Sequence, residues 1–190
     1  MILSNLGILA AMKADRLKIE NLAGLDPSRE PFNTSSVDLR LAPEIYIPKR
    51  LEKAWDLRVD YPGTFLLENS DHVIITKEKP FVLEPHVFIL GWTMEHVHFP
   101  MDDNGPCYSA RVEGKSSRAR CGLVVHLTAP TIHNEFNGKI ALEMVNLSLT
   151  PILLHAGVYI CQLVVEQLDR LAVTAPNQFS GQANPVGTKR

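Results

Sequence analysis

The sequence predicts a mainly β protein, built as a sandwich, a jelly roll or a barrel. The first indication is a series of apolar segments, each shorter than a typical helix, that recur along most of the chain. The second is that turn-forming residues separate these segments, since the chain holds 13 prolines and 11 glycines among 190 residues. Short strands between closely spaced turns are typical of antiparallel β folds with two facing sheets.

A short helix is expected at the N-terminus. Ser4 is suited to cap it, because a serine oxygen can accept a hydrogen bond from an N–H group of the first turn. Ile8, Leu9 and Met12 follow at helical spacing on one face, and the pattern ends near residues 13–15.

The first clear strand is predicted over residues 36–41. Three aliphatic residues alternate there with Ser36, Asp38 and Arg40, so one face of this strand should be apolar and the other polar. Further strands are predicted from the apolar runs at residues 64–67, 73–76, 87–93, 96–99, 123–127, 140–145, 152–154 and 159–165.

Composition indicates a single domain over residues 1–190. The apolar fraction of 45% and the charged fraction of 21% are close to globular averages. Residues 1–30 form the predicted N-terminal helix and arm. Residues 175–190 are small and polar without periodicity, so they are expected to form a flexible C-terminal tail or a lid that orders on a ligand.

Charge and cysteine content narrow the expected partners. The formal net charge is −2, from 19 basic and 21 acidic residues, so there is no overall basic field for nucleic acid. No apolar run approaches the roughly 20 residues that span a bilayer, so no membrane partner is expected. Cys107, Cys121 and Cys161 have no metal-ligand spacing, which predicts free thiols and a cytoplasmic location.

A cationic, hydroxyl-rich loop begins at Gly114, which permits close approach of the backbone to a ligand. The side chains that follow could bind phosphate oxygens through charge-assisted hydrogen bonds, namely those of Lys115, Ser116, Ser117, Arg118 and Arg120. The spacing is not that of a Walker A loop. From composition alone, a solvated charged turn remains the alternative. If the ligand is a polyphosphate, Mg²⁺ is expected to bind through its oxygens.

Glu143 is a lone carboxylate in an otherwise apolar strand. Ala141, Glu143 and Val145 share one face of that strand, and Ile140, Leu142, Met144 and Asn146 share the other. Burial would raise the proton affinity of the Glu143 carboxylate, as a general acid or base at neutral pH requires. The alternative is a glutamate on an edge strand that faces solvent.

Two other groups of residues invite a metal-site interpretation and do not support it. His96 and His98 lie on one strand face, but no third ligand follows at a convincing spacing. Pro106 and Cys107 match half of the zinc-deaminase signature, whose second cysteine and His-x-Glu partner are missing. We therefore expect no zinc site.

Several motifs together carry a family resemblance that spans nearly the whole chain. Residues 114–123, Gly-Lys-Ser-Ser-Arg-Ala-Arg-Cys-Gly-Leu, are close to Gly-Arg-Ser-Ser-Leu-Ala-Arg-x-Gly-Leu, and residues 126–129 and 138–146 follow at matching spacing. Residues 35–41, 90–95 and 157–163 complete the set. The sequence resembles the dCTP deaminase branch of the trimeric deoxyuridine triphosphatase superfamily.

The resemblance implies a distorted jelly-roll β-barrel and a homotrimer whose active sites lie between subunits. It implies zinc-independent hydrolysis of dCTP to dUTP and ammonia, with Mg²⁺ held by the substrate triphosphate. By position, Glu143 would shuttle protons, Ser116 would hold the attacking water and Arg120 would stabilise charge beside it. Substrate binding is assigned in the same way to Lys115, Ser117, Leu127, Thr128, Ala129, His133, Phe136, Gln162, Phe179 and Gln182.

Some residues depart from the family pattern. His133 stands where the family has an aspartate of the sugar and hydrolytic-water site, and Glu135 replaces a glycine. Gln178 and Phe179 stand where members often have a basic residue and a tyrosine. His133 weakens the diphosphatase interpretation, and His133, Glu135 and Gln178 together suggest a non-catalytic nucleotide-binding homologue as one alternative. The other alternative to the simple deaminase is a bifunctional enzyme that carries dCTP through to dUMP.

Overall fold

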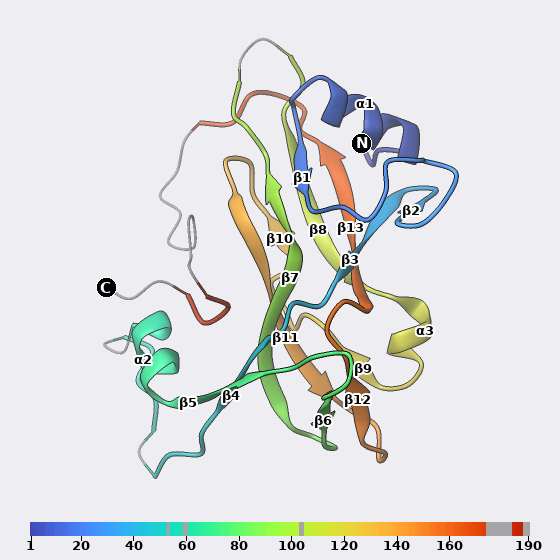
Figure 1. Ribbon diagram of the computed structural model, residues 1–190. Coiled ribbons are helices and arrows are strands. Elements are labelled where there is room, and N and C mark those ends of the chain that lie inside the picture. Colours follow the sequence, from blue (N-terminus) through green and yellow to red (C-terminus); the bar gives the residue numbers. More distant parts are fainter. Residues whose placement is uncertain (53, 59–60, 103–104, 174–183, 188–190) are drawn as a thin grey trace.

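The computed structural model describes residues 1–52, 54–58, 61–102, 105–173 and 184–187 (Figure 1). Within them three helices are found, α1 (Asn5–Lys13), α2 (Pro62–Glu68) and α3 (Ser116–Ala119). The strands are β1 (Lys18–Glu20), β2 (Phe32–Asn33), β3 (Ser36–Arg40), β4 (Glu44–Pro48), β5 (Ser70–Ile74), β6 (Phe81–Leu83), β7 (Phe88–His98), β8 (Tyr108–Gly114), β9 (Leu123–Val124), β10 (Thr131–Ile132), β11 (Asn137–Asn146), β12 (Ile152–Leu154) and β13 (Tyr159–Gln167).

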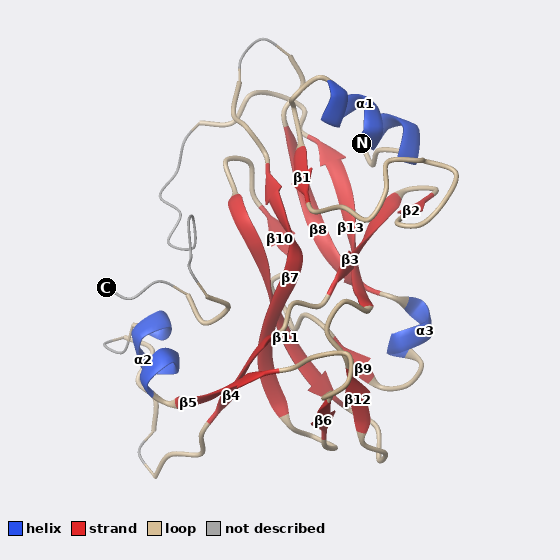
Figure 2. Ribbon diagram, in the orientation of Figure 1, coloured by secondary structure: helices blue, strands red, loops and turns tan. Residues whose placement is uncertain are grey.

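Two antiparallel sheets make up most of the molecule. One has the strand order β5-β4-β7-β11-β9, with β1 also paired to β7, and the other has the order β10-β8-β13-β3-β2. A small third sheet pairs β12 with β6. An isolated bridge between Leu41 and Thr93 links the two large sheets. Figure 2 shows the helices at the periphery of this strand framework. The mainly β prediction is confirmed, although the pairings described form separate sheets rather than one continuous barrel.

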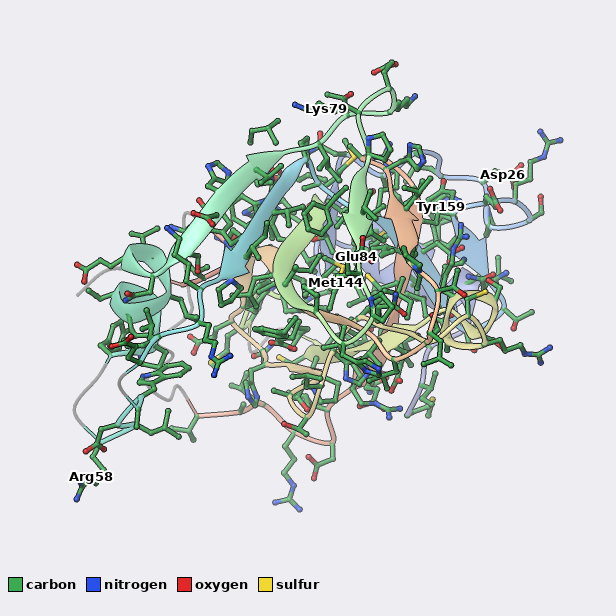
Figure 3. The ribbon with its side chains drawn as sticks, turned by 90° about the horizontal axis from the view of Figure 1, so that it is seen from below. Asp26, Arg58, Lys79, Glu84, Met144 and Tyr159 are labelled. Atoms are coloured by element: carbon green, nitrogen blue, oxygen red, sulfur yellow. The ribbon has the colours of Figure 1, made fainter. Side chains whose placement is uncertain are left out.

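The core lies between the two large sheets. It is filled by aliphatic side chains that alternate along the long strands, as the period of two in a β-strand requires, among them Leu39, Ile45, Ile89, Leu142, Met144 and Leu163. Figure 3 shows Met144 inside the molecule, whereas Asp26, Arg58 and Lys79 project from its periphery. Ile140, Leu142, Met144 and Asn146 are all buried, so the inward face predicted for this strand is confirmed.

Helix α1 forms as predicted. Ser4 is its N-cap, and the Ser4 Oγ accepts a hydrogen bond from the Gly7 N–H at 3.2 Å. The helix ends at Lys13, within the expected limits. Ile8 and Ala11 are its buried residues, and they pack it against the end of the strand framework.

The strand predicted over residues 64–67 is wrong, because this segment lies in helix α2. A short apolar run without alternation fits a strand or a helix equally well. Pro62 occupies the first helical turn, where an N–H group has no partner within the helix, so its absence is tolerated. At the C-terminal end, the Asn69 N–H donates a hydrogen bond to the Phe65 carbonyl.

Other strand boundaries also differ from the prediction. The strands predicted over residues 87–93 and 96–99 are one long strand, β7, which runs from Phe88 to His98. The strand predicted over residues 73–76 lies earlier in the chain, since β5 ends at Ile74. The strand predicted over residues 123–127 is confined to Leu123–Val124.

Cys107, Cys121 and Cys161 are free thiols, as predicted. Cys107 and Cys161 are buried, and burial raises the pKa of the Cys161 thiol. In the described part of the chain, no helix has the length and apolar character needed to cross a membrane.

Candidate active site

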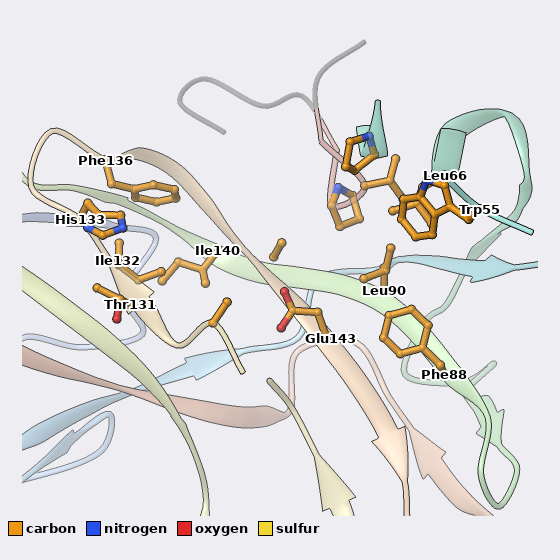
Figure 4. Close-up of a pocket in the computed structure, with 15 residues that line it drawn as sticks. Trp55, Leu66, Phe88, Leu90, Thr131, Ile132, His133, Phe136, Ile140 and Glu143 are labelled. Carbon is orange, nitrogen blue, oxygen red and sulfur yellow. The ribbon is translucent and has the colours of Figure 1, made fainter. Parts of the chain in front are cut away.

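A pocket of about 420 Å³ opens beside strands β7 and β11 (Figure 4). Its walls come from the segment around α2, from β7, from the turn before β11, from β11 and from the C-terminal segment. The lining residues are Trp55, Pro62, Leu66, Phe88, Leu90, Ala129, Thr131, Ile132, His133, Phe136, Ile140, Ala141, Glu143, Pro185 and Val186. Glu143 is the one carboxylate among these described residues, and the other side chains are mostly apolar.

Glu143 lies between the two ends of this pocket (Figure 4). The Leu127 N–H donates a hydrogen bond to the Glu143 Oε2 at 3.4 Å. Burial raises the pKa of the Glu143 carboxyl, and this effect outweighs the lowering by the Leu127 N–H and by the nearby His126. Glu143 is thus a partly buried acid whose proton affinity is increased by its surroundings, which suits acid–base chemistry.

His126 lies near the Glu143 carboxylate and also near a row of charged side chains on the neighbouring sheet. The His126 Nε2 lies 3.6 Å from the Glu113 Oε2. Arg111 lies between Glu113 and Glu166, with nitrogen to oxygen distances of 3.5 and 3.0 Å. The other His126 ring nitrogen, Nδ1, is buried and has no hydrogen-bond partner among the described residues. Sequence reasoning assigned no role to His126.

The turn before β11 forms the end of the pocket that contains His133 and Phe136. Asn134 anchors it by donating to the Tyr108 carbonyl at 3.0 Å, and the Glu135 N–H donates to the Phe99 carbonyl at 2.8 Å. Glu135 has a φ of 69°, which is the left-handed conformation that favours glycine. The turn therefore keeps a glycine-type backbone at the position where glutamate replaces the family glycine.

The cationic loop forms a short exposed helix elsewhere on the molecule. The Arg118 and Ala119 N–H groups both donate to the Lys115 carbonyl at 2.9 Å. Ser116, Ser117 and Arg120 are exposed, and none of them lines the pocket. In Figure 1, α3 lies on the opposite side of β11 from α2. The structure of one chain does not bring these residues to Glu143.

Lys115 and Gln162 are held by buried partners at the base of this loop. Lys115 forms an ion pair with Asp38, a carboxylate of β3 that is 2% exposed, and Asp38 also accepts from the Asn33 Nδ2 at 2.9 Å. Gln162 donates to the Gly114 carbonyl at 3.2 Å and accepts from the Ser36 Oγ at 2.9 Å. Ser36 and Asp38, which were predicted on a polar strand face, are therefore buried and hold the start of the loop.

Other expected substrate-binding residues are placed as follows. Ala129 lines the pocket, and Leu127 touches Glu143 through its backbone. Thr128 is exposed and is not among the lining residues. Phe179 and Gln182 lie outside the described residues. From the C-terminal segment, Pro185 and Val186 line the pocket, and Val186 is only 3% exposed, a contact that sequence reasoning did not single out.

The histidines of β7 do not form a cluster of ligands. The His96 Nδ1 lies 4.0 Å from a Glu20 carboxylate oxygen, and burial lowers the pKa of His98. No group of three or more His, Cys, Asp or Glu side chains able to hold a metal is found in the described parts of the chain.

The site thus combines a carboxylate of raised pKa in an apolar pocket with a cationic turn that lies apart from it, and the carboxylate suits acid–base chemistry. A family model described as dCTP deaminase-like matches residues 2–168. The dCTP deaminase, dUMP-forming, of Dictyoglomus thermophilum is 33% identical over 195 residues, which cover 100% of this chain and 94% of that protein. The protein of the same name from Mycobacterium ulcerans is 35% identical over 190 residues, which cover 100% of this chain and 90% of that protein. The chain therefore belongs to the dCTP deaminase-like family.

A solved structure supports the fold. The 2'-deoxycytidine 5'-triphosphate deaminase of Agrobacterium tumefaciens matches with a TM-score of 0.62 and 23% identity. The match covers 86% of this chain and 47% of that one, so this chain spans about half of the solved protein. At this identity the likeness concerns the fold, and it agrees with the mainly β class.

Proposed function

We propose that this chain hydrolyses the amino group of dCTP, with Glu143 as the proton-transferring residue. The observation that carries the proposal is the position of Glu143, a carboxyl of raised pKa in the middle of an apolar pocket. Relatives that are 33% and 35% identical over this whole chain are named as dCTP deaminases, which supports the same substrate.

The chemistry requires several proton transfers at one place. Water must add at C4 of cytosine, N3 must gain a proton, and the amine must leave as ammonia. Glu143 takes one proton from the attacking water and gives it to N3, then takes the second proton from the C4 hydroxyl and gives it to the departing amine. The Leu127 N–H steadies the Glu143 carboxylate between these steps. Because one carboxyl performs all the transfers, the rate should depend more on the position of Glu143 relative to the cytosine ring than on the strength of any single hydrogen bond.

The remaining reaction groups come from a second subunit in this proposal. Ser116 begins α3 and Arg120 follows its last residue; both are exposed and absent from the pocket of their own chain. In a homotrimer, α3 of one subunit would face the Glu143 pocket of the next. Ser116 would then hold the attacking water, Arg120 would stabilise the developing charge, and Ser117 would bind the triphosphate.

Mg²⁺ fits this proposal as a companion of the substrate. The described side chains of the loop are cations and hydroxyls, which suit phosphate oxygens, and the nearby Asp38 is paired with Lys115. The ion would therefore be held by the triphosphate and would neutralise part of its charge.

We further propose that the reaction continues to dUMP. The names of both relatives, dCTP deaminase, dUMP-forming, favour this bifunctional outcome. One observation favours the second candidate, a deaminase that stops at dUTP: His133 lines the pocket at the position where the family pattern has an aspartate. A histidine cannot supply the carboxylate that this pattern uses to activate water at the phosphates.

One assay tests both proposals. The purified protein is incubated with dCTP and Mg²⁺, and ammonia, pyrophosphate and the product nucleotides are measured together. We expect ammonia and pyrophosphate in equal amounts, with dUMP as product. Ammonia with dUTP and no pyrophosphate would establish the simple deaminase. Nucleotide binding without ammonia would establish the non-catalytic alternative. Glu143→Gln serves as the control, since it should bind dCTP and lower turnover by orders of magnitude.

A further inference from the structure

The pocket continues past Glu143 into a region of apolar side chains. We call this region, which is formed by Trp55, Leu66, Phe88 and Leu90, the apolar lobe. Figure 4 shows these four side chains on one side of Glu143, and Thr131 and His133 on the other. The pocket therefore has two chemically different ends with the reactive carboxyl between them.

Strand pairing fixes the position of the apolar lobe. Leu90 is the register partner of Glu143, and Phe88 is the partner of Val145, two residues further along β11. The side chains on this face point into the pocket. The opposite wall is held by an aromatic stack, since the rings of Trp55 and Phe65 are 4.7 Å apart and nearly parallel. The apolar lobe is thus a built part of the pocket.

The chemistry of the two ends orients a bound nucleoside. Placing a sugar hydroxyl in the apolar lobe would leave it without a hydrogen-bond partner, which is unfavourable. Thr131 and His133 offer polar groups at the other end. On the cytosine ring, the sugar-bearing N1 lies opposite C4, which carries the amine. When C4 faces Glu143 and the sugar faces His133, a substituent on C5, the neighbour of C4, points past Glu143 into the apolar lobe.

We propose that the apolar lobe accepts a small apolar group on C5, so that this chain deaminates 5-methyl-dCTP as well as dCTP. This inference rests on the proposed deaminase function and extends its substrate class. The reaction is the same hydrolysis: the water oxygen bonds to C4, the C4–N bond breaks, and ammonia leaves. Deamination of 5-methyl-dCTP thereby gives 5-methyl-dUTP, which is dTTP, and release of pyrophosphate in the proposed second step then gives dTMP. Burying one methyl group corresponds to about a fourfold gain in kcat/KM.

The test compares kcat/KM for dCTP and 5-methyl-dCTP by ammonia release. The wild-type protein should use 5-methyl-dCTP at least as well as dCTP, up to the fourfold gain. Leu66→Trp fills the apolar lobe and should lower the ratio of the two kcat/KM values by at least about tenfold. Leu67→Trp is the matched control, because Leu67 lies on the same helix and is not among the residues that line the pocket. It should leave both values unchanged.

The outcomes separate this inference from the proposed function. Ammonia from dCTP but not from 5-methyl-dCTP would overturn the inference and leave the deaminase standing. Equal losses for both nucleotides in Leu66→Trp would also overturn it, since the lobe would then hold the unmodified base. Ammonia from neither nucleotide would overturn the proposed function and the inference with it. If Leu66→Trp does not fold, Leu66→Ala enlarges the lobe and should raise kcat/KM for 5-propynyl-dCTP relative to 5-methyl-dCTP.

Discussion

Glu143 shows how far a single residue can be interpreted from its neighbours in sequence. The alternation in residues 140–146 places its side chain opposite a core-facing row, and the structure confirms both faces of the strand. The raised pKa depends on what covers the carboxyl. The neighbours of the carboxyl include Leu90 on a partner strand and the Leu127 N–H in a loop, and the Leu127 N–H lowers the pKa that burial raises. Sequence could therefore identify the carboxylate but could not decide between an exposed and a half-buried glutamate.

The raised pKa of Glu143 predicts a pH dependence of stability. Because burial raises the folded-state pKa above the unfolded value of 4.5, folding favours the protonated carboxyl. The associated stability is fully present below pH 4.5 and is lost as pH rises through the folded pKa. Glu143→Gln cannot ionise, so its melting temperature should exceed that of the wild type more at pH 8 than at pH 4. Parallel pH profiles in thermal unfolding would contradict a raised pKa.

Asp38 marks the limit of residue-scale prediction. Its position in an alternating strand indicated a polar face, which usually means solvent. The structure instead buries it against Lys115, which lies 77 residues further along the chain. A pairing over this distance depends on where β8, which ends just before Lys115, lies relative to β3 in the sheet. It leaves no local pattern in the sequence.

At the scale of elements, the loop around α3 is fixed at both ends. Gln162 and Lys115 tie its start to β13 and β3. At its end, Gly122 has a φ of +85° and its carbonyl accepts from the Leu147 N–H at 2.8 Å. The family-like motif therefore encodes an exposed turn that is held at both ends and that carries the side chains proposed to bind phosphate.

The role of Lys115 can be decided by one substitution. Lys115→Ala leaves the buried Asp38 without its cation, so the free energy of unfolding should fall by roughly 3 kcal/mol. Lys115→Arg keeps the charge and should retain most of the stability. Both are measured by chemical denaturation. Lys115 would instead bind the phosphates if Lys115→Ala left the stability unchanged and lowered the affinity for dCTP much more than the affinity for deoxycytidine.

Gly122 should tolerate no side chain. A Cβ at this position would lie 2.7 Å from the Ser148 nitrogen, and the backbone is left-handed. We expect Gly122→Ala to lower the free energy of unfolding by roughly 2 kcal/mol or more. Gly7→Ala is a suitable comparison, because its Cβ would find ordinary space in helix α1 and should stabilise the protein slightly. Similar effects of the two substitutions in denaturant titrations would rule out the close approach.

The elements that sequence predicted best are the long alternating strands and the capped helix α1. These are fixed by local signals, namely period-two burial and the Ser4 cap. The segment of helix α2 resembles a strand in sequence, because its three apolar residues after Thr64 show no period that separates a strand from a helix. The pocket could not be predicted at all, since it joins this helix to β7, β11 and the C-terminal segment.

At the scale of the whole molecule, the two halves of the proposed site lie apart within one chain. Glu143 lines the pocket, whereas Ser116 and Arg120, at the two ends of the α3 turn, are exposed and do not line it. The proposed completion of the site between subunits would explain why an exposed turn carries the most specific motif of the sequence. It would also make the activity depend on assembly, which no single-chain pattern can reveal.

Mixing two inactive variants tests this account most directly. Glu143→Gln and Arg120→Ala should each be inactive as homotrimers. Refolded together in equal amounts, they should recover up to about a quarter of the wild-type ammonia release, because random assembly pairs an intact α3 with an intact Glu143 in about one site in four. Ser116→Ala mixed with Arg120→Ala is the control and should stay inactive, since both changes affect α3. No recovery in the first mixture, with both variants folded and exchanged into mixed oligomers, would contradict a shared site.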